Sequence, residues 1–145
     1  MQGCNCLAGI TPFAPGCLDG VDVIVDCLLG TGFQGALREN YRTAIEEINA
    51  SNAQVISVDI NSGMNGDTGD GELIVGSDLT VTIGFVKNGL VTPNAGNYMK
   101  RLVCADIGIR LAKEENKICA TGEHHANAIP CPPWLDMAVI DVTSD

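Results

Sequence analysis

The chain has 145 residues, a formal net charge of −10 and a hydrophobic content of 46 %. This length supports one domain with its own core and is too short for two ordinary domains. The acidic balance argues against nucleic acids and anionic membranes as partners, because both are held by clusters of Lys and Arg.

The sequence also lacks the usual membrane and export signals. No apolar run reaches the roughly 20 residues that span a bilayer, and MQGCNCLAGITPFAPG at the N-terminus does not read as a signal peptide. There are seven cysteines, and Cys27 and Cys104 lie in apolar runs where a thiol acts as a small hydrophobe. We expect a cytoplasmic protein without a disulfide framework.

The predicted elements alternate between strands and a helix. After an irregular segment, residues 1–21, DVIVDCLL at 22–29 reads as a buried strand. Residues 36–52 form an amphipathic helix with one apolar face, and further strands are predicted at 54–60, 78–84 and 101–109; the helix face comprises Tyr41, Ala44, Ile45 and Ile48. This order predicts an α/β fold with a parallel sheet. Residues 111–145 show no clear period and receive no assignment.

Two loops follow the first two strands, where parallel α/β sheets bind their ligands. The first contains GTGFQG, whose glycines allow a ligand to approach the backbone closely. Its spacing differs from the dinucleotide fingerprint, so a tight turn is an equal alternative. Asp26 lies in the first strand, either as a hydrogen-bonded structural acid or as a ligand of a hard cation together with Ser62.

Asp59 ends the second strand and opens a glycine-rich loop. It is either a turn-forming residue or a functional residue, as a general acid/base or as a ligand to a sugar hydroxyl. Lys87 follows the third strand, and solvation alone is sufficient to explain an exposed lysine. His124 and His125 lie near Cys119 and Cys131, but their spacing does not match a structural zinc site.

Four segments, taken together, resemble one family. They are DVIVDCLLGTGFQGALRENY, VISVDINSGMNGDTG, DLTVTIGFVKNGL and AGNYMKRLVCADIGI. In order and spacing they resemble the NAD(P)H-hydrate epimerase family, the YjeF N-terminal domain, over residues 22–110. The family segment D-I-P-S-G has Asn61 here in place of proline. The resemblance implies a Rossmann-like, three-layer α/β/α fold with a mainly parallel sheet.

The resemblance also implies an isomerase that interconverts the R and S epimers of hydrated NADH and NADPH. Asp59 and Lys87 would be catalytic, and Asp26 and Ser62 would bind K⁺. The substrate would contact Asp59 and the loop of Gly30, Thr31, Gly32, Phe33, Gln34, Gly35 and Ala36. A dehydratase would then act on the S epimer.

The family normally begins with a further segment that carries an Asn-Asn-Gly-Gly-Asp-Gly loop, which is absent from this sequence. We therefore expect a domain incomplete at its N-terminus, with weak activity, marginal stability and self-association through an exposed apolar first strand. The alternatives are a non-catalytic nucleotide-binding module and a protein-interaction module built on the same fold. Residues 111–145 would form an unassigned tail.

Overall fold

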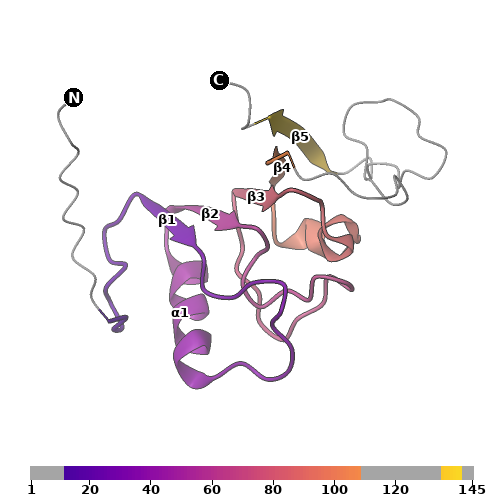
Figure 1. The fold of residues 1–145 in the computed structure, drawn as a ribbon. Coiled ribbons are helices and arrows are strands. Elements are labelled where there is room, and N and C mark those ends of the chain that lie inside the picture. Colours follow the sequence, from indigo (N-terminus) through magenta and orange to yellow (C-terminus); the bar gives the residue numbers. More distant parts are fainter. Residues whose placement is uncertain (1–11, 109–134, 142–145) are drawn as a thin grey trace.

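The computed structural model describes residues 12–108 and 135–141, and Figure 1 shows their arrangement. Five parallel strands form one sheet in the order β1-β2-β3-β4-β5. The strands are Val23–Asp26 (β1), Gln54–Val58 (β2), Leu79–Ile83 (β3), Arg101–Asp106 (β4) and Asp136–Asp141 (β5). Helix α1, Glu39–Ala50, connects β1 to β2. Two short 3₁₀ helices, Asn88–Val91 (η1) and Ala95–Asn97 (η2), lie between β3 and β4. The predicted Rossmann-like α/β class is confirmed.

The strand boundaries differ from the predicted ones for local reasons. β1 stops at Asp26, because the backbone then turns so that the Leu28 N–H reaches the Asp26 carboxylate. β2 stops at Val58, because Asp59 adopts a left-handed conformation with φ of 71°. β5 lies in the stretch that received no assignment, since a short apolar run does not distinguish a strand from a helix.

Helix α1 follows the predicted amphipathic pattern. Ala44, Ile45 and Ile48 are buried against the sheet, and Tyr41 is half-buried. The helix ends at Ala50, and the backbone N–H and side-chain hydroxyl of Ser51 both donate to the carbonyl of Ile48. No helix among the described residues is long and apolar enough to cross a membrane.

The core of the described residues lies mainly on one side of the sheet. One cluster, under β1 and β2, joins Ile24 and Val55 to Ile45 and Ile48 of α1. A second cluster, centred on Leu90, Met99 and Leu102, lies under β3 and β4. Figure 1 shows α1 and both 3₁₀ helices on this same side. The described residues thus supply one of the two outer layers expected of a three-layer fold.

Of the two cysteines predicted to pack as small hydrophobic residues, one is buried and the other is exposed. Cys104 is buried, and burial raises the pKa of its thiol, as expected for a cysteine that acts as a core residue. Cys27 is exposed, so the prediction that it packs as a small hydrophobe is wrong. The reason is that β1 ends one residue earlier, which leaves Cys27 in the loop. Cys17, Cys27 and Cys104 are all free thiols.

Asn61, which stands where the family segment has proline, is a fully buried hydrogen-bonding centre. Its amide nitrogen lies within hydrogen-bond distance of the Val75 carbonyl, the Ser77 hydroxyl and the Tyr98 carbonyl, at 2.8 to 3.1 Å. Its amide oxygen accepts from the Thr80 hydroxyl at 2.7 Å. This side chain ties the loop after β2 to β3 and to the segment before β4. A proline could supply none of these hydrogen bonds.

We expect Asn61→Ala to lower the free energy of unfolding by about 2–3 kcal/mol, because several buried polar groups lose a partner. Asn52→Ala is the matched control, since Asn52 is exposed, and its effect should stay within about 0.5 kcal/mol. Urea denaturation followed by circular dichroism measures both values. Equal effects of the two substitutions would contradict a structural role for the Asn61 amide.

Candidate functional site

Three charged residues lie at or after the carboxyl ends of neighbouring strands. Asp26 is the last residue of β1, Asp59 follows β2 and Lys87 follows β3. The three strands are parallel and adjacent, so their carboxyl ends lie at one edge of the sheet. The topology therefore brings the predicted catalytic and metal-binding positions to the same end of the fold, where parallel sheets bind ligands.

Asp26 is only 1 % exposed, and its carboxylate is fully hydrogen-bonded within the chain. Oδ2 accepts from the Ser57 hydroxyl and from the Ser62 N–H, both at 2.9 Å. Oδ1 accepts from the Ser62 hydroxyl at 2.6 Å and from the Leu28 N–H at 3.3 Å. These four donors offset the cost of burying the charge. The described structure thus fits the interpretation of Asp26 as a hydrogen-bonded structural acid.

Ser62 joins this carboxylate to the glycine loop. Its hydroxyl oxygen accepts from the Leu29 N–H at 2.9 Å and lies 3.4 Å from the Leu29 carbonyl oxygen. A carboxylate, a hydroxyl and a backbone carbonyl therefore gather around one point. These are hard oxygen donors, so their chemistry fits an alkali cation. No cluster of three His, Cys, Asp or Glu side chains suitable for a metal occurs among the described residues.

The glycine loop borders a cavity of about 380 Å³ shared with the loop after β2. Phe33, Gln34 and Gly35 line this cavity from one side, and Gly63 and Asn65 line it from the other. Gly63 has φ of 90°, and a side chain there would collide with the carbonyl of Leu73. The cavity lining thus includes three of the seven predicted loop residues, while Asp59 is not part of it.

Gly30 and Gly32 differ from Gly63 in backbone conformation and in the space around them. Neither has a positive φ, and a methyl group added at either position would meet nothing within 4 Å. The described fold therefore does not require glycine at these two positions. Thr31 lies between them, and its side chain faces Gly66 of the loop after β2, 3.6 Å from where a methyl group on Gly66 would lie. Ala36, the last predicted loop residue, is exposed.

Asp59 and Lys87 form an ion pair. The Lys87 ammonium donates to Asp59 Oδ1, to the Thr82 hydroxyl at 3.0 Å and to the Ile83 carbonyl at 3.1 Å. The Ile83 N–H donates to the same Asp59 oxygen at 3.1 Å. Both side chains are partly open to solvent, with 30 % of Asp59 and 20 % of Lys87 exposed.

The backbone of Asp59 is held in a sparsely populated conformation. It is the one non-glycine residue with a positive φ in the described parts of the chain. Such a conformation costs about 1–3 kcal/mol and persists where surrounding contacts enforce it. Here the Asp59 N–H donates to the Val81 carbonyl at 2.7 Å, while the side chain is held by Ile83 and Lys87. The carboxylate and ammonium form a fixed proton acceptor and proton donor.

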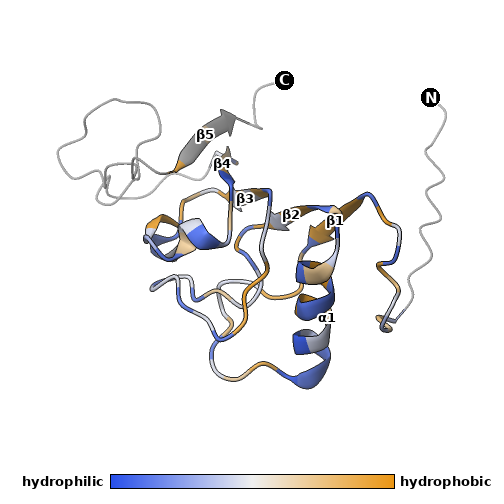
Figure 2. Ribbon diagram, turned by 180° about the vertical axis from the view of Figure 1, so that it is seen from behind, coloured by the Kyte–Doolittle hydropathy of each residue, from blue (hydrophilic) through white to orange (hydrophobic). Residues whose placement is uncertain are grey.

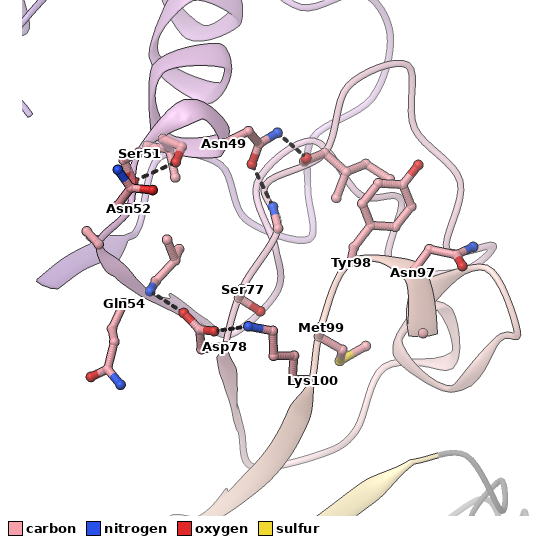
Figure 3. Close-up of a pocket in the computed structure, with 16 residues that line it drawn as sticks. Asn49, Ser51, Asn52, Gln54, Ser77, Asp78, Asn97, Tyr98, Met99 and Lys100 are labelled. Atoms are coloured by element: carbon pink, nitrogen blue, oxygen red, sulfur yellow. Dashed lines mark hydrogen bonds and ion pairs between the residues drawn. The ribbon is translucent and has the colours of Figure 1, made fainter.

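A cavity of about 570 Å³ lies at the opposite, amino ends of the strands. Figure 3 shows its polar lining, in which Asp78 accepts from the Val55 N–H and from the Lys100 ammonium. These hydrogen bonds, chiefly that from Lys100, lower the pKa of Asp78. Ionised Asp78 therefore contributes stability above its ordinary pKa that is lost as the pH falls. None of the predicted site residues lines this cavity, so we do not place the chemistry there.

Sequence reasoning missed two supporting residues. Ser57 and Thr82 are both fully buried and hold Asp26 and Lys87, respectively. In the sequence, each stands out only as a hydroxyl side chain at a buried position of a mainly apolar strand. That feature does not show which residue the hydroxyl contacts. The disfavoured zinc ligands lie outside the described residues: Cys119, His124, His125 and Cys131.

Comparison with known proteins identifies the relatives of this chain. The bifunctional NAD(P)H-hydrate repair enzyme Nnr of Pyrobaculum aerophilum is 47 % identical over 89 residues, 61 % of this chain and 18 % of the relative. The NAD(P)H-hydrate epimerase of Limosilactobacillus fermentum is 40 % identical over 93 residues, 63 % of this chain and 45 % of the relative. The NAD(P)H-hydrate epimerase of Rhodopirellula baltica is 40 % identical over 97 residues, 66 % of this chain and 40 % of the relative.

In each case the matched region is less than half the length of the relative. The family model described as YjeF-related protein N-terminus matches residues 5–89, which is more than half of the 145 residues. Those residues include the glycine loop and the Asp26, Asp59 and Lys87 positions at the ends of the first three strands. The chain therefore belongs to the YjeF-related protein N-terminus family.

Proposed function

We propose that this chain carries catalytic residues of an NAD(P)H-hydrate epimerase, an isomerase that interconverts the R and S epimers of hydrated NADH and NADPH. The observation that carries the proposal is the Asp59–Lys87 pair, held at the carboxyl edge of the sheet in a chain whose relatives bear this name. A catalytic role explains why a strained, partly exposed acid is kept in contact with a lysine.

The glycine loop supports a dinucleotide substrate. Gly30 and Gly32 leave open space that no described residue fills. A ligand whose phosphates approach the backbone closely would use that space and would exclude side chains from it. Phe33 and Gln34 line the adjoining cavity and are placed to contact the remainder of such a ligand. Thr31, Gly35 and Ala36 complete the proposed substrate loop.

The chemistry requires a proton donor and a proton acceptor close to the hydrated ring carbon. Loss of the hydroxyl as water, driven by the lone pair of the ring nitrogen, leaves an iminium-like carbon. Addition of water to the opposite face, with loss of a proton, produces the other epimer and conserves all atoms. Lys87 and Asp59 form a pair that can deliver the first proton and accept the second. We assign Asp59 the contact with the substrate and Lys87 the partner role.

The reaction suggests which enzyme acts next on its product. The S epimer would pass to an NAD(P)H-hydrate dehydratase, and several relatives are named bifunctional repair enzymes. The free thiols among the described cysteines support a reducing, cytoplasmic compartment.

The Asp26, Ser62 and Leu29 oxygens would hold K⁺, which would contribute a fixed positive charge near the loop.

We expect Asp59→Asn to lower the rate of epimerisation by about 10²- to 10⁴-fold, the usual contribution of a general acid/base. Asparagine also tolerates the left-handed conformation, so the fold should be preserved. The assay supplies the R epimer of hydrated NADH, with and without K⁺, and follows the S epimer by chromatography. Circular dichroism checks that the variant is folded.

Asp78→Asn is the matched control, because Asp78 is also paired with a lysine but lies at the opposite end of the strands. It should leave epimerisation unchanged. Full activity of Asp59→Asn, or an equal loss in both variants, would overturn the catalytic assignment. Binding of the hydrated dinucleotide by the parent chain without any conversion would favour the non-catalytic nucleotide-binding module.

Potassium should raise the melting temperature of the parent chain more than sodium does at equal ionic strength, because a ligand that binds the folded state stabilises it. Ser62→Ala should abolish this difference between the two ions. Comparing ions within each variant removes the general stability cost of losing the Ser62 hydrogen bonds.

Ser51→Ala provides the control for the potassium experiment. Ser51 is a half-buried serine at the end of α1, far in the fold from the Asp26 carboxylate, and its loss should preserve the potassium effect. An equal response of the parent to both ions, or an undiminished response in Ser62→Ala, would rule out the proposed cation site.

A further inference from the structure

Thr82 places a hydroxyl at a fully buried position near the carboxyl end of β3. Figure 2 shows β3 inside the sheet, between β2 and β4, so this position has a strand on either side. Valine has the same branched shape and suits such a position equally well. A buried hydroxyl is costly unless it is hydrogen-bonded, so the partners of the Thr82 hydroxyl indicate what it does.

The Thr82 hydroxyl has two partners, and both belong to the segment that follows β3. It donates its proton to the Phe85 carbonyl at 3.3 Å. Its oxygen accepts from the Lys87 ammonium at 3.0 Å. A hydrogen bond from a charged donor is stronger than one between neutral groups, and burial strengthens it further. The main contact of this hydroxyl is therefore the one with the lysine.

Lys87 has one acceptor for each of its three ammonium protons. Besides Thr82, these acceptors are Asp59 Oδ1 and the Ile83 carbonyl. A lysine side chain has many rotamers, so it keeps a single position only where several contacts restrain it. The Thr82 and Ile83 oxygens come from β3, whereas Asp59 follows β2. β3 thus determines where the ammonium lies against the carboxylate.

These contacts leave the two carboxylate oxygens of Asp59 in different states. Oδ1 accepts from both the Lys87 ammonium and the Ile83 N–H. The described residues donate no hydrogen bond to Oδ2, and 30 % of the Asp59 side chain is exposed. Two hydrogen bonds occupy the lone pairs of Oδ1, so Oδ2 is the atom of this carboxylate that can exchange a proton with a substrate.

We propose that Thr82 is a positioning residue of the site: its buried hydroxyl holds the Lys87 ammonium on Oδ1 of Asp59 and so keeps Oδ2 open to the substrate. This inference rests on the proposed function, because it assigns a role within the Asp59–Lys87 pair. Without the hydroxyl, the ammonium loses one of its three restraints and can move onto Oδ2 or into solvent. The pair then has the productive arrangement in a smaller fraction of the molecules.

Three variants separate this positioning role from a general effect on stability. Thr82→Val keeps the branched shape and removes the hydroxyl, whereas Thr82→Ser keeps the hydroxyl. Thr80→Val is the matched control, because Thr80 is also fully buried on the same face of β3, but its hydroxyl donates to Asn61 at 2.7 Å. Urea denaturation measures the stability of each variant.

Thr82→Val should lower kcat of epimerisation about ten- to hundredfold, because the pair is displaced from its working geometry. KM should stay within about twofold, since the Thr82 hydroxyl is buried and does not bind the substrate itself. Thr82→Ser should recover most of the lost kcat. Thr80→Val should keep kcat within about twofold of the parent, even where it lowers stability as much as Thr82→Val does.

A second measurement needs no enzyme activity. In the parent chain, NMR at low temperature and mildly acidic pH should show the Lys87 ammonium as a slowly exchanging signal, because three acceptors hold its protons. The absence of this signal in Lys87→Arg assigns it. Thr80→Val and Thr82→Ser should keep the signal, whereas Thr82→Val should accelerate its exchange with water at least about tenfold.

An unchanged kcat in Thr82→Val, an equal loss of kcat in Thr80→Val or no recovery in Thr82→Ser would each overturn the proposal. Slow exchange of the Lys87 signal that persists in Thr82→Val would overturn it without reference to activity. A parent chain that converts no substrate, yet loses the slow signal in Thr82→Val alone, would refute the proposed function and support the hold of Thr82 on the lysine.

Discussion

The buried carboxylate of Asp26 is the interaction on which the carboxyl edge of the sheet depends. It binds the end of β1 to β2 through Ser57 and to the following loop through the N–H and hydroxyl of Ser62. Ser62 in turn accepts from Leu29 at the start of the glycine loop. Removing the carboxylate would leave several buried donors unpaired, so the two loops of the candidate site share one anchor.

The Asp59–Lys87 pair illustrates how a stable frame holds an unfavourable local conformation. The left-handed backbone of Asp59 is costly on its own, but β3 supplies a carbonyl, an N–H and, through Thr82, a support for the lysine. The pair is partly open to solvent, whereas Asp26 is enclosed. This contrast separates a carboxylate that holds the fold together from one that is partly open to solvent.

The distribution of apolar side chains divides the sheet into two unlike faces. Toward α1 the strands contribute buried residues such as Ile24, Val55 and Leu102, together with the hydroxyls that support the site. Away from α1 the strands are equally apolar in sequence, yet Val23 and Val25 face solvent in the described structure. The strands thus carry apolar side chains on both faces, as in a sheet that is buried on both sides, but the described residues cover only one face of this sheet.

The amino-acid sequence by itself determined the α/β class, the helix face around Ile45 and the placement of Asp59 and Lys87 after strands, because hydrophobic period and glycine content are local signals. It placed Asp26 inside a longer strand, and only the structure shows that β1 ends at this residue. It could not determine that Ser57 and Ser62 donate hydrogen bonds to Asp26, or that Lys87 contacts Asp59, because these partners lie 28 to 36 residues apart. Nor could it reveal which face of the strands lacks a cover. Only the tertiary structure decided these points, since hydrogen-bond partners and solvent exposure depend on how distant segments meet.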